Sequence, residues 1–376
     1  MEVIGYGINR PGPPTPGGIP MVRAGDIVDS RITTADIVNV EREIAEVRHP
    51  RTLLWPGDLL VVLVGRIGDA AVAGPEHAGW NIARSVALIR CTEPELAQWL
   101  RIWLRMPAVR SWCEAQAVGT VQRTLGLKAL RELPVVLPPS SDRDEILRVI
   151  QAAESRSEIN DRIARTAVSL ADAHFNVLAA DKKSWTGRTF GRVLREIQAG
   201  TTQRSTGRLA NSSFVAPADI FNSYLPHLAA PDKIEPSEAR SAILVAPKSG
   251  HVYAVVTRSP VIAGRGVLQL TPRRDDEVWW LLHEIRSRSV ELSQFAQGTA
   301  ARELSARSFS QAKVVWPPDN VIRRFARIAR VLHERAQEAR NENSTLEVLL
   351  EAYLSMKSET FGFIAGTKCG PSPVIM

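Results

Sequence analysis

The sequence has little cysteine and no long apolar run. Only three of its 376 residues are cysteine, with no CxxC spacing, so neither a disulfide framework nor a zinc site is predicted. The longest apolar run, residues 59–64, is far shorter than the roughly 20 residues that span a bilayer. The N-terminus lacks the apolar segment of a signal peptide. We therefore expect a cytoplasmic protein.

Motifs that carry chemistry are also absent. No GxxxxGK[ST] string is present to bind nucleotide phosphates, and no serine elbow accompanies a His and Asp pair. The double prolines in LPPS and WPPD lack the flanking residues of the adenine-methylase tetrapeptide NPPY, and are interpreted as strand ends before a helix. Gly65 and Gly68 fit a hairpin turn better than a nucleotide loop. No catalytic residue, metal site or cofactor is predicted.

What the chain does have is a positive charge and enough apolar residues for a core. Lys and Arg total 47 against 40 for Asp and Glu, a formal net charge of +7, and 44% of the residues are hydrophobic. A folded protein of this length has room for two domains. The charge is compatible with binding phosphates, although many basic proteins bind no nucleic acid.

One internal repeat organises the chain. An offset of 179 residues aligns the two halves without a gap, and each copy reads strand, Trp-containing helix, small-residue turn, strand ending in a double proline, and long helix. The matched pairs include Thr92 and Thr271, Gly119 and Gly298, Thr120 and Thr299, Arg123 and Arg302, and Leu125 and Leu304. A single register over this length is not readily produced by chance.

Two long helices are predicted at about residues 142–180 and 321–358. Their apolar and small residues follow the alternating four-and-three spacing of a coiled-coil seam. Asn160 and Asn343 fall on these seams, where each either fixes the register of the pair or points to solvent. A helix of about 40 residues is ~60 Å long, so two domains at the ends of an antiparallel pair would be suited to two separated half-sites on DNA.

The motifs and their order resemble the specificity subunit of type I restriction-modification systems. GGIPMVRAGDI, PGDLLVVLVGRIGDAAV and AVGTVQRTLGLKALRELPVVLPP resemble that family's "iP.vr..di", "GD.l....G.iG...v" and "G..q..l....l..lpv.lPp" stretches, and a long helix follows. The second half repeats the series, beginning at FGRVLREIQAGTT and ending at AQGTAARELSARSFSQAKVVWPP. The resemblance covers nearly the whole chain.

The resemblance implies an α+β fold with two target-recognition domains in a pseudo-twofold repeat, separated by two long antiparallel coiled-coil-like helices. The expected boundaries are target-recognition domain 1 at 1–140, spacer helix 1 at 141–182, target-recognition domain 2 at 183–319, spacer helix 2 at 320–358, and a flexible tail at 359–376.

It also implies a non-catalytic subunit that reads a bipartite, asymmetric duplex DNA target. The implied partners are adenine methyltransferase subunits, two copies, and endonuclease/translocase subunits. Those subunits would use S-adenosylmethionine, ATP and magnesium, so no cofactor is expected on this chain. The alternatives are a catalytic fusion, which should carry a cofactor motif, and a coiled-coil adaptor that no longer reads DNA.

Candidate DNA contacts lie in the matched turns and in loops that differ between the copies. The turn residues are Thr120, Gln122, Arg123, Thr299 and Arg302. Hydroxyl, amide and guanidinium groups suit phosphate and base-edge contacts, but a Gly-Thr turn present in both copies can equally be one that the fold requires. The loop cations are Arg66, Arg84, Lys248, His251, Arg258 and Arg265, each of which is either a base contact or a solvated surface charge.

Two further groups of residues allow structural and functional interpretations. The tryptophans of the short helices, such as Trp99 and Trp279, are expected in the core rather than at a base-stacking site or interface. Arginines on the long helices, among them Arg323, Arg327 and Arg330, form either a solvated outer face or a docking site for the methyltransferase subunits.

Overall fold

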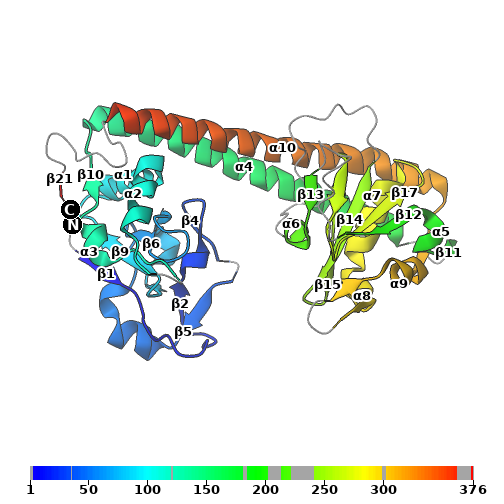
Figure 1. Cartoon of the computed structure of the whole chain (residues 1–376), viewed down its shortest axis with the longest axis horizontal. Coiled ribbons are helices and arrows are strands. Elements are labelled where there is room, and N and C mark those ends of the chain that lie inside the picture. Colours follow the sequence, from blue (N-terminus) through cyan, green and yellow to red (C-terminus); the bar gives the residue numbers. More distant parts are fainter. Residues whose placement is uncertain are drawn as a thin grey trace. The chain divides into compact units, whose positions relative to one another are not determined.

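The computed structural model describes residues 3–34, 36–119, 122–180, 184–201, 213–221, 241–298, 302–361 and 374–375. Thr120 and Thr299 lie outside these residues. The chain divides into two compact units: unit 1 comprises residues 1–155 and 346–376, and unit 2 comprises residues 156–345. Each unit mixes strands with helices (Figure 1), which confirms the predicted α+β class.

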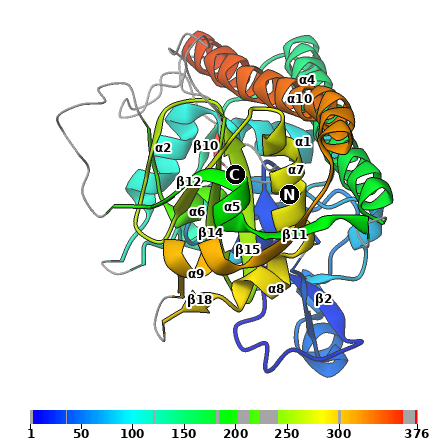
Figure 2. The same ribbon diagram turned by 90° about the vertical axis from the view of Figure 1, so that its right-hand side faces the viewer.

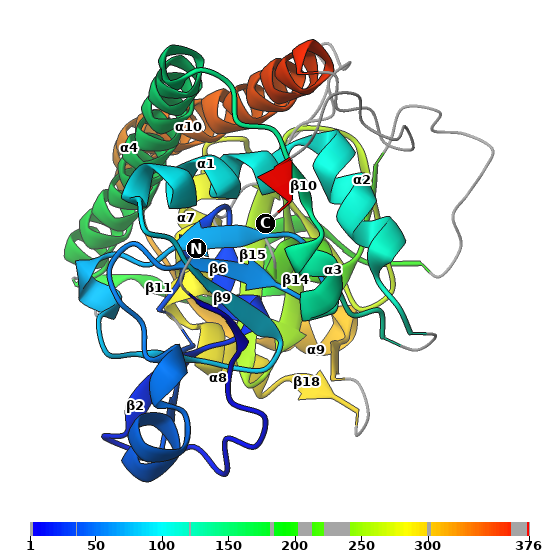
Figure 3. The same cartoon turned by 90° about the vertical axis from the view of Figure 1, so that its left-hand side faces the viewer.

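A four-stranded antiparallel sheet forms the centre of unit 1. Its strands, in spatial order, are β1 (Val3–Tyr6), β9 (Val86–Arg90), β6 (Leu59–Val62) and β7 (Ala70–Val72). Side chains along β6 alternate between two apolar layers, so all four of its residues are buried. One layer contains the helices α1 (Pro94–Arg105) and α2 (Pro107–Gln116), and the segment containing β2 lies on the opposite side (Figure 3).

Smaller elements complete unit 1. A three-stranded sheet packs against the second face of the central sheet, and in it β2 runs parallel to β8. Its strands in spatial order are β5 (Val38–Val40), β2 (Ile19–Val22) and β8 (Asn81–Ile82). Further short elements include the hairpin of β3 (Ile27–Val28) and β4 (Arg31–Ile32), the helix α3 (Leu127–Arg131) and the strand β10 (Pro134–Val135).

Unit 2 repeats this layering (Figure 2). Its central antiparallel sheet contains β12 (Leu194–Ala199), β17 (Leu268–Pro272), β14 (Ala242–Lys248) and β15 (His251–Thr257). One face packs against α7 (Glu277–Ser287) and α8 (Ser289–Ser293), and the other against the parallel pair of β13 (Ser213–Val215) and β16 (Val261–Ala263) and the helix α6 (Pro217–Phe221). The short elements that follow are β18 (Ala296–Gln297), β19 (Glu303–Leu304) and α9 (Ala306–Gln311).

The same close crossing of two backbone segments occurs in each unit, at Gly7 in unit 1 and at Gly200 in unit 2. The Gly7 amide donates to the Val86 carbonyl, and the Gly200 amide donates to the Val267 carbonyl. At both glycines the chain passes so close to its neighbour that a Cβ would lie 2.1 Å from a carbonyl oxygen at Gly7 and 1.9 Å at Gly200. Both positions therefore require glycine, and the repeat extends to the details of strand crossing.

Strand pairing corrects the gapless alignment of the two halves. Ile89 in β9 and Leu270 in β17 occupy the same sheet position, which gives an offset of 181 rather than 179. Thr92 lies beyond the end of β9, whereas Thr271 is inside β17. The predicted match of these two threonines is wrong, because the helical segment between this strand and the small-residue turn is two residues shorter in unit 2: Ala117 follows Arg90 by 27 residues, whereas Ala296 follows the equivalent Thr271 by 25. The offset of 179 holds from the small-residue turn onward.

The two long helices are α4 (Ser140–Ala179) and α10 (Asp319–Thr360). Both contribute to both units, and within each unit they run antiparallel. In unit 1, Glu145 pairs with Lys357 at 3.6 Å; in unit 2, Arg156 pairs with Glu342 at 2.6 Å. The predicted seam residues are buried or half-buried, which confirms the coiled-coil spacing. No helix in the described part of the chain is long and apolar enough to cross a membrane.

A buried asparagine pair joins the helices in unit 2. The Asn160 amide donates to Oδ1 of Asn343 at 3.0 Å, and Nδ2 of Asn343 donates to Oδ1 of Asp161 at 2.9 Å. Asn160 has no exposed surface, so the alternative in which it points to solvent is excluded. A polar pair of this kind is satisfied in one register only, as in coiled coils.

Each long helix is followed by a strand that pairs back onto a unit. The strand after α4, β11 (Thr186–Thr189), runs antiparallel to β20 (Lys313–Trp316) and leads into the short helix α5 (Phe190–Val193). The strand after α10, β21 (Val374–Ile375), runs antiparallel to β10. This differs from the flexible tail predicted for residues 359–376: α10 continues to Thr360, and the chain end contributes a strand to unit 1.

Candidate nucleic-acid interface

Three turns meet at one edge of the sheet in unit 1. The Leu63 amide, at the end of β6, donates to the Ser85 carbonyl at 2.9 Å, and the Leu125 amide donates to the Leu63 carbonyl at 2.9 Å. This residue therefore joins the turn between β6 and β7, the turn before β9, and the small-residue turn of residues 117–125. The turns carry the predicted contacts Arg66, Arg84, Gln122 and Arg123, so the structure brings all four to this edge.

Unit 2 presents the same edge with different side chains. Lys248 and His251 flank the two-residue turn between β14 and β15, where Ser249 and Gly250 both have positive φ. Arg265 precedes β17, and its Nε lies 3.0 Å from a carboxylate oxygen of Glu303 in the small-residue turn. That second turn, residues 296–304, packs through β19 against β14. It also carries Arg302.

The small-residue turns have matching backbone geometry. Gly119 has φ of +118° and Gly298 has φ of +116°. Arg123 donates to the Ala117 carbonyl at 3.2 Å, and Arg302 donates to the Ala296 carbonyl at 3.0 Å. Both arginines thus close their turns, which supports the structural alternative for these residues. Each guanidinium is exposed and has five N–H donors, so it keeps donors that the turn does not use.

Arg84 and Arg265 occupy one position of the repeat. Each directly follows a residue that forms an isolated β-bridge with the residue after the crossing glycine. Ala83 bridges to Ile8, which follows Gly7, and Gly264 bridges to Thr201, which follows Gly200. The sequence alignment of the two halves predicts that these arginines differ between the copies. The structure corrects this, because the two-residue change of offset had placed them out of register. What differs between the edges is the hairpin cations: Arg66 in unit 1, and Lys248 with His251 in unit 2.

Arg66 is held by neighbouring polar groups. Its Nε lies 2.7 Å from Oδ2 of Asp69, and Nη2 donates to the Ile27 carbonyl. Asp69 also accepts from Arg110 at 2.6 Å. Arg66, Asp69 and Arg110 line a cavity of about 530 Å³, and its lining also includes Arg101 and Arg105. Sequence reasoning missed the three helical arginines, because nothing in their spacing on α1 and α2 distinguishes them from an outer helix face.

The remaining cations differ in position. The Lys248 ammonium lies 4.9 Å above the Phe221 ring, and the ring Nδ1 of His251 lies 3.2 Å from the Ser249 carbonyl. Both side chains remain at the turn edge. Arg258 follows β15 at the other end of the sheet, where it pairs with Glu334 of α10 at 3.3 Å and lies over the Trp279 ring. The structure does not bring Arg258 to the edge with the other candidates.

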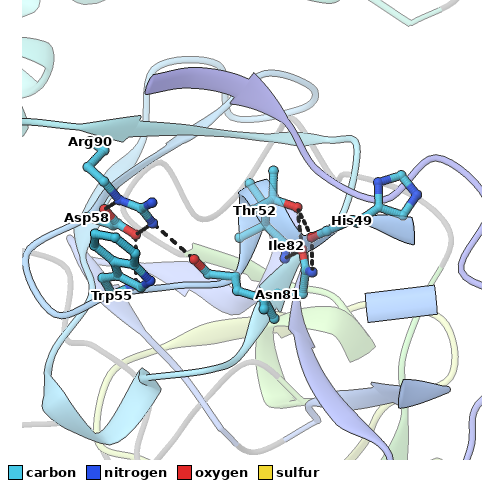
Figure 4. Close-up of polar contacts among 8 residues, drawn as sticks. His49, Thr52, Trp55, Asp58, Asn81, Ile82 and Arg90 are labelled. Atoms are coloured by element: carbon cyan, nitrogen blue, oxygen red, sulfur yellow. Dashed lines mark hydrogen bonds and ion pairs between the residues drawn. The ribbon is translucent and has the colours of Figure 1, made fainter. Parts of the chain in front are cut away.

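The far end of the unit 1 sheet is closed by a buried ion pair (Figure 4). Asp58, at the start of β6, accepts two hydrogen bonds from Arg90, at the end of β9, at 2.7 and 2.6 Å. The guanidinium also donates to the Leu53 carbonyl and lies 3.9 Å over the ring of Trp55. The Gly57–Asp58 dipeptide of the GD motif therefore fixes the β6–β9 pair that carries Arg66 and Arg84 at its opposite end.

A buried histidine cluster joins three helices in unit 2. Nδ1 of His283 lies 2.6 Å from Asp172, and its Nε2 lies 2.9 Å from Nε2 of His333. Burial lowers the pKa of His283, while the hydrogen bond to Asp172 opposes that shift. The hydrogen bond from His283 and the charge of Arg286 lower the pKa of Asp172, although its burial acts in the opposite direction. The spacing of these residues along the chain does not indicate a cluster, because the fold brings the three elements together.

Comparisons with known proteins agree with the motifs. No family model matches the chain. It is 30% identical over 169 residues to the specificity subunit of the EcoBI type I restriction enzyme of Escherichia coli. The matched stretch is 43% of this chain, and the chain spans only 35% of that relative's length.

Solved structures align with most of the chain. A type I restriction-modification S subunit from M. genitalium aligns over 94% of this chain and 92% of its own, with a TM-score of 0.53 and 15% identity. An HsdS subunit from Thermoanaerobacter tengcongensis aligns over 93% and 90% of the two chains, with a TM-score of 0.33 and 18% identity. The resemblance predicted from the motifs is therefore confirmed in sequence and, through the first of these structures, in fold.

Proposed function

We propose that this chain, which is related in sequence and fold to type I specificity subunits, is the DNA-recognition subunit of a type I restriction-modification complex. The observation that carries the proposal is the repeated turn edge: two units present the same three turns with different hairpin cations. A shared frame with different side chains suits a reader of two unlike half-sites. The target is therefore a bipartite, asymmetric duplex.

The proposed DNA contacts are of two kinds: contacts to phosphates, which position the protein on the duplex, and contacts to base edges, which read the sequence. Arg84 and Arg265 occupy one position in both units, so we assign them to the phosphate backbone, which is the same in any half-site. Arg66 in unit 1, and Lys248 with His251 in unit 2, differ between the units and are assigned to base edges. Arginine and lysine pair with guanine O6 and N7 in the major groove.

The small-residue turns supply further groups. Gln122 is exposed at its turn and has an amide able to pair bidentately with adenine. Arg123 and Arg302 each have donors left for phosphate after closing the turn. Thr120 and Thr299, outside the described residues, remain proposed contacts from the sequence.

The same proposal gives the chain its partners. A subunit without chemistry of its own needs adenine methyltransferase subunits, two copies, to modify the target, and endonuclease/translocase subunits to restrict unmodified DNA. Those subunits would carry S-adenosylmethionine, ATP and magnesium. Because the substrate is cellular DNA, the complex would act in the cytoplasm.

Selection from a randomised duplex library tests the proposal. The chain is purified with its methyltransferase subunits, and bound duplexes are sequenced for the wild type, Arg66→Ala, and Lys248→Ala with His251→Ala. We expect one bipartite motif, with one half relaxed by the first variant and the other half by the second. Arg258→Ala is the control, since it lies away from the edge and should leave both halves intact.

Two results would contradict the proposal. A complex that assembles but enriches no motif would favour an adaptor that no longer reads DNA. Variants of the two edges that relax the same half-site would exclude the assignment of one half-site to each unit.

A further inference from the structure

Two arginines of unit 1 share one carboxylate beside β7, the outer strand of the central sheet. Nε of Arg66 donates to Oδ2 of Asp69 at 2.7 Å, and Nη2 of Arg110 donates to Oδ1 at 2.6 Å. Arg66 lies in the turn between β6 and β7, whereas Arg110 lies on α2. Because each carboxylate oxygen accepts from a different arginine, the two guanidiniums are held as a pair.

The turn and the helix that carry these arginines pack directly against each other. Cys113, one helical turn after Arg110 on α2, is fully buried, and a Cβ at Gly68 would lie 3.8 Å from the Cβ of Cys113. On the other side of the turn, Nη2 of Arg66 donates to the Ile27 carbonyl. Both guanidiniums are therefore placed before a ligand binds, which lowers the entropy cost of binding.

The pair is accessible from outside unit 1. The side chains of Arg66 and Arg110 are 55% and 45% exposed, and that of Asp69 is 17% exposed. All three residues line the cavity of about 530 Å³. A guanidinium has five N–H donors, and these hydrogen bonds use two on Arg66 and one on Arg110. Each arginine therefore keeps the two donors that a bidentate contact to guanine requires.

The other two arginines of this cavity are bound differently. Arg101 donates to Glu154 at 2.6 and 3.1 Å, and its side chain is 6% exposed. Arg105 lies 3.5 Å from the same carboxylate and is 23% exposed. Because Glu154 belongs to α4, these two arginines join α1 to the long helix within unit 1. They stabilise the unit and are less available to a ligand than the pair at Asp69.

Unit 2 has a different group at the position of Asp69. The strand registers of the two hairpins place Tyr253 there. The rings of Tyr253 and Phe221 pack edge to face with centroids 5.3 Å apart, and the Lys248 ammonium lies 4.9 Å above the Phe221 ring. Aromatic rings thus support the hairpin cation of unit 2, whereas a carboxylate supports that of unit 1. The position differs between the two edges, as expected where two half-sites differ.

We infer that Arg66 and Arg110 read two neighbouring G·C pairs in the half-site bound by unit 1, and that Asp69 is the residue that positions them. Nitrogens bonded to the two oxygens of one carboxylate lie within about two base-pair rises of 3.4 Å of each other. Arginine pairs bidentately with O6 and N7 of guanine, and neighbouring base pairs present these acceptors one rise apart. The inference rests on the proposed function, and adds to it a second reading residue and the base pairs that unit 1 selects.

Selection from a randomised duplex library tests the pair. The chain is purified with its methyltransferase subunits, and the bound duplexes are sequenced for the wild type, Arg66→Ala, Arg110→Ala and Asp69→Ala. We expect two adjacent G·C pairs in one half of the wild-type motif. Each arginine variant should reduce the preference for guanine at one of these pairs about tenfold or more, and Asp69→Ala should reduce it at both. The other half of the motif should be unchanged, which shows that the variants fold.

Two control variants separate positioning from a general effect on the cavity. Arg105→Ala removes an arginine that lines the same cavity but is bonded to Glu154, and it should leave the motif intact. Asp69→Asn keeps the size of the side chain and one acceptor oxygen, so it should relax the motif less than Asp69→Ala does. The salt dependence of DNA binding should not become shallower in either Asp69 variant, because no phosphate contact is removed.

An unchanged motif for Arg110→Ala would overturn the inference, and a salt slope lower by about 0.9 in that variant would assign Arg110 to a phosphate instead. Equal relaxation by Arg105→Ala would also overturn it, since the pair at Asp69 would then have no separate role. A unit 1 half-site without adjacent G·C pairs would contradict the inference and leave the proposed function intact. If the wild type selects no motif, both fail.

Discussion

The two units have the same backbone arrangement, but each is stabilised internally by different polar groups. In unit 1, Asp58 and Arg90 join the far ends of β6 and β9. The corresponding residues in unit 2 are Ala242 and Thr271, and no ion pair ties these strand ends there. Unit 2 has instead a cluster in which the buried His283 contacts the buried His333 and the partly exposed Asp172.

The comparison extends to the long helices. His333 of α10 corresponds to Glu154 of α4, which accepts hydrogen bonds from Arg101 at 2.6 and 3.1 Å. An ion pair in one unit thus stands where a histidine cluster stands in the other. The fold constrains the turns and strand crossings, while a buried polar group can be exchanged as long as its partners change with it.

Breaking the ion pair of unit 1 should have the largest effect. Asp58→Ala leaves Arg90 buried without its carboxylate, which costs about 3–5 kcal/mol. Hydrogen exchange in urea should show unit 1 amides losing protection while unit 2 amides keep theirs. Asp58→Leu with Arg90→Met removes both charges and should recover most of the loss. Equal loss in both units would show that they do not unfold separately.

Acid should loosen unit 2 first. The pKa of His283 is lowered by burial, so the folded unit binds this proton less readily than the unfolded chain, whose ordinary value is 6.5. The stabilisation is complete above that value and is lost as the pH falls through the folded pKa, at up to about 1.4 kcal/mol per pH unit. The cause is the hydrogen bonding of His283, whose Nδ1–H donates to Asp172 while its Nε2 accepts from Nε2–H of His333. A proton added to Nε2 of His283 would place its N–H opposite the N–H of His333.

Measuring the unfolding of unit 2 between pH 8 and pH 5 tests whether its free energy of unfolding falls as the pH is lowered. His283→Phe should flatten the pH dependence, whereas the exposed His251→Ala should leave it unchanged. A unit 2 that is equally stable at both ends of the range would contradict the role of the cluster.

Replacing the glycine of either small-residue turn should lower the free energy of unfolding by a similar amount. Gly119→Ala and Gly298→Ala each place a Cβ on a residue with φ near +117°, which costs about 1–2 kcal/mol. A Cβ at Gly119 would also lie 2.5 Å from the Gln122 carbonyl oxygen. Thermal unfolding of the two variants should therefore show similar losses. A loss confined to one variant would mean that the turns are not equivalent.

The smallest effects on stability are expected at the phosphate positions. Arg84→Ala and Arg265→Ala are exposed changes and should alter the free energy of unfolding by no more than about 0.5 kcal/mol. Each should lower the slope of log affinity against log salt by about 0.9 if it removes one phosphate contact. Unequal slopes for the two variants would contradict their equivalence in the repeat.

The sequence predicted what depends on periodicity and repetition. The long helices, their antiparallel seam and the matched turns all follow from spacing along the chain, and the structure confirms them. The gapless offset failed between β9 and the small-residue turn, because a two-residue difference in the length of the helical segment between them changes the register without a visible change in composition. The pairing of β21 with β10 was missed because two residues give no strand signal by themselves.

The candidate site was predicted in part. Residues within turns could be named, since turns carry their own sequence signals. Arg66 could be proposed from its loop, but Arg110 could not, because a cation on a helix is recognised as part of a site only when the fold places Asp69 beside it. The cluster of Asp172, His283 and His333 could not be predicted from the sequence either, because its members lie on three different helices.

Methylome sequencing tests the central claim most directly, namely that each unit reads one half of a bipartite target. A host expressing this chain with its methyltransferase is compared with a host that expresses a chain whose residues 190–320 come from a relative. We predict a bipartite N6-methyladenine motif in the first host, and in the second a motif with one half retained and the other replaced. A motif that is unchanged by the swap, or the absence of any motif while the methyltransferase is active and bound, would contradict the claim.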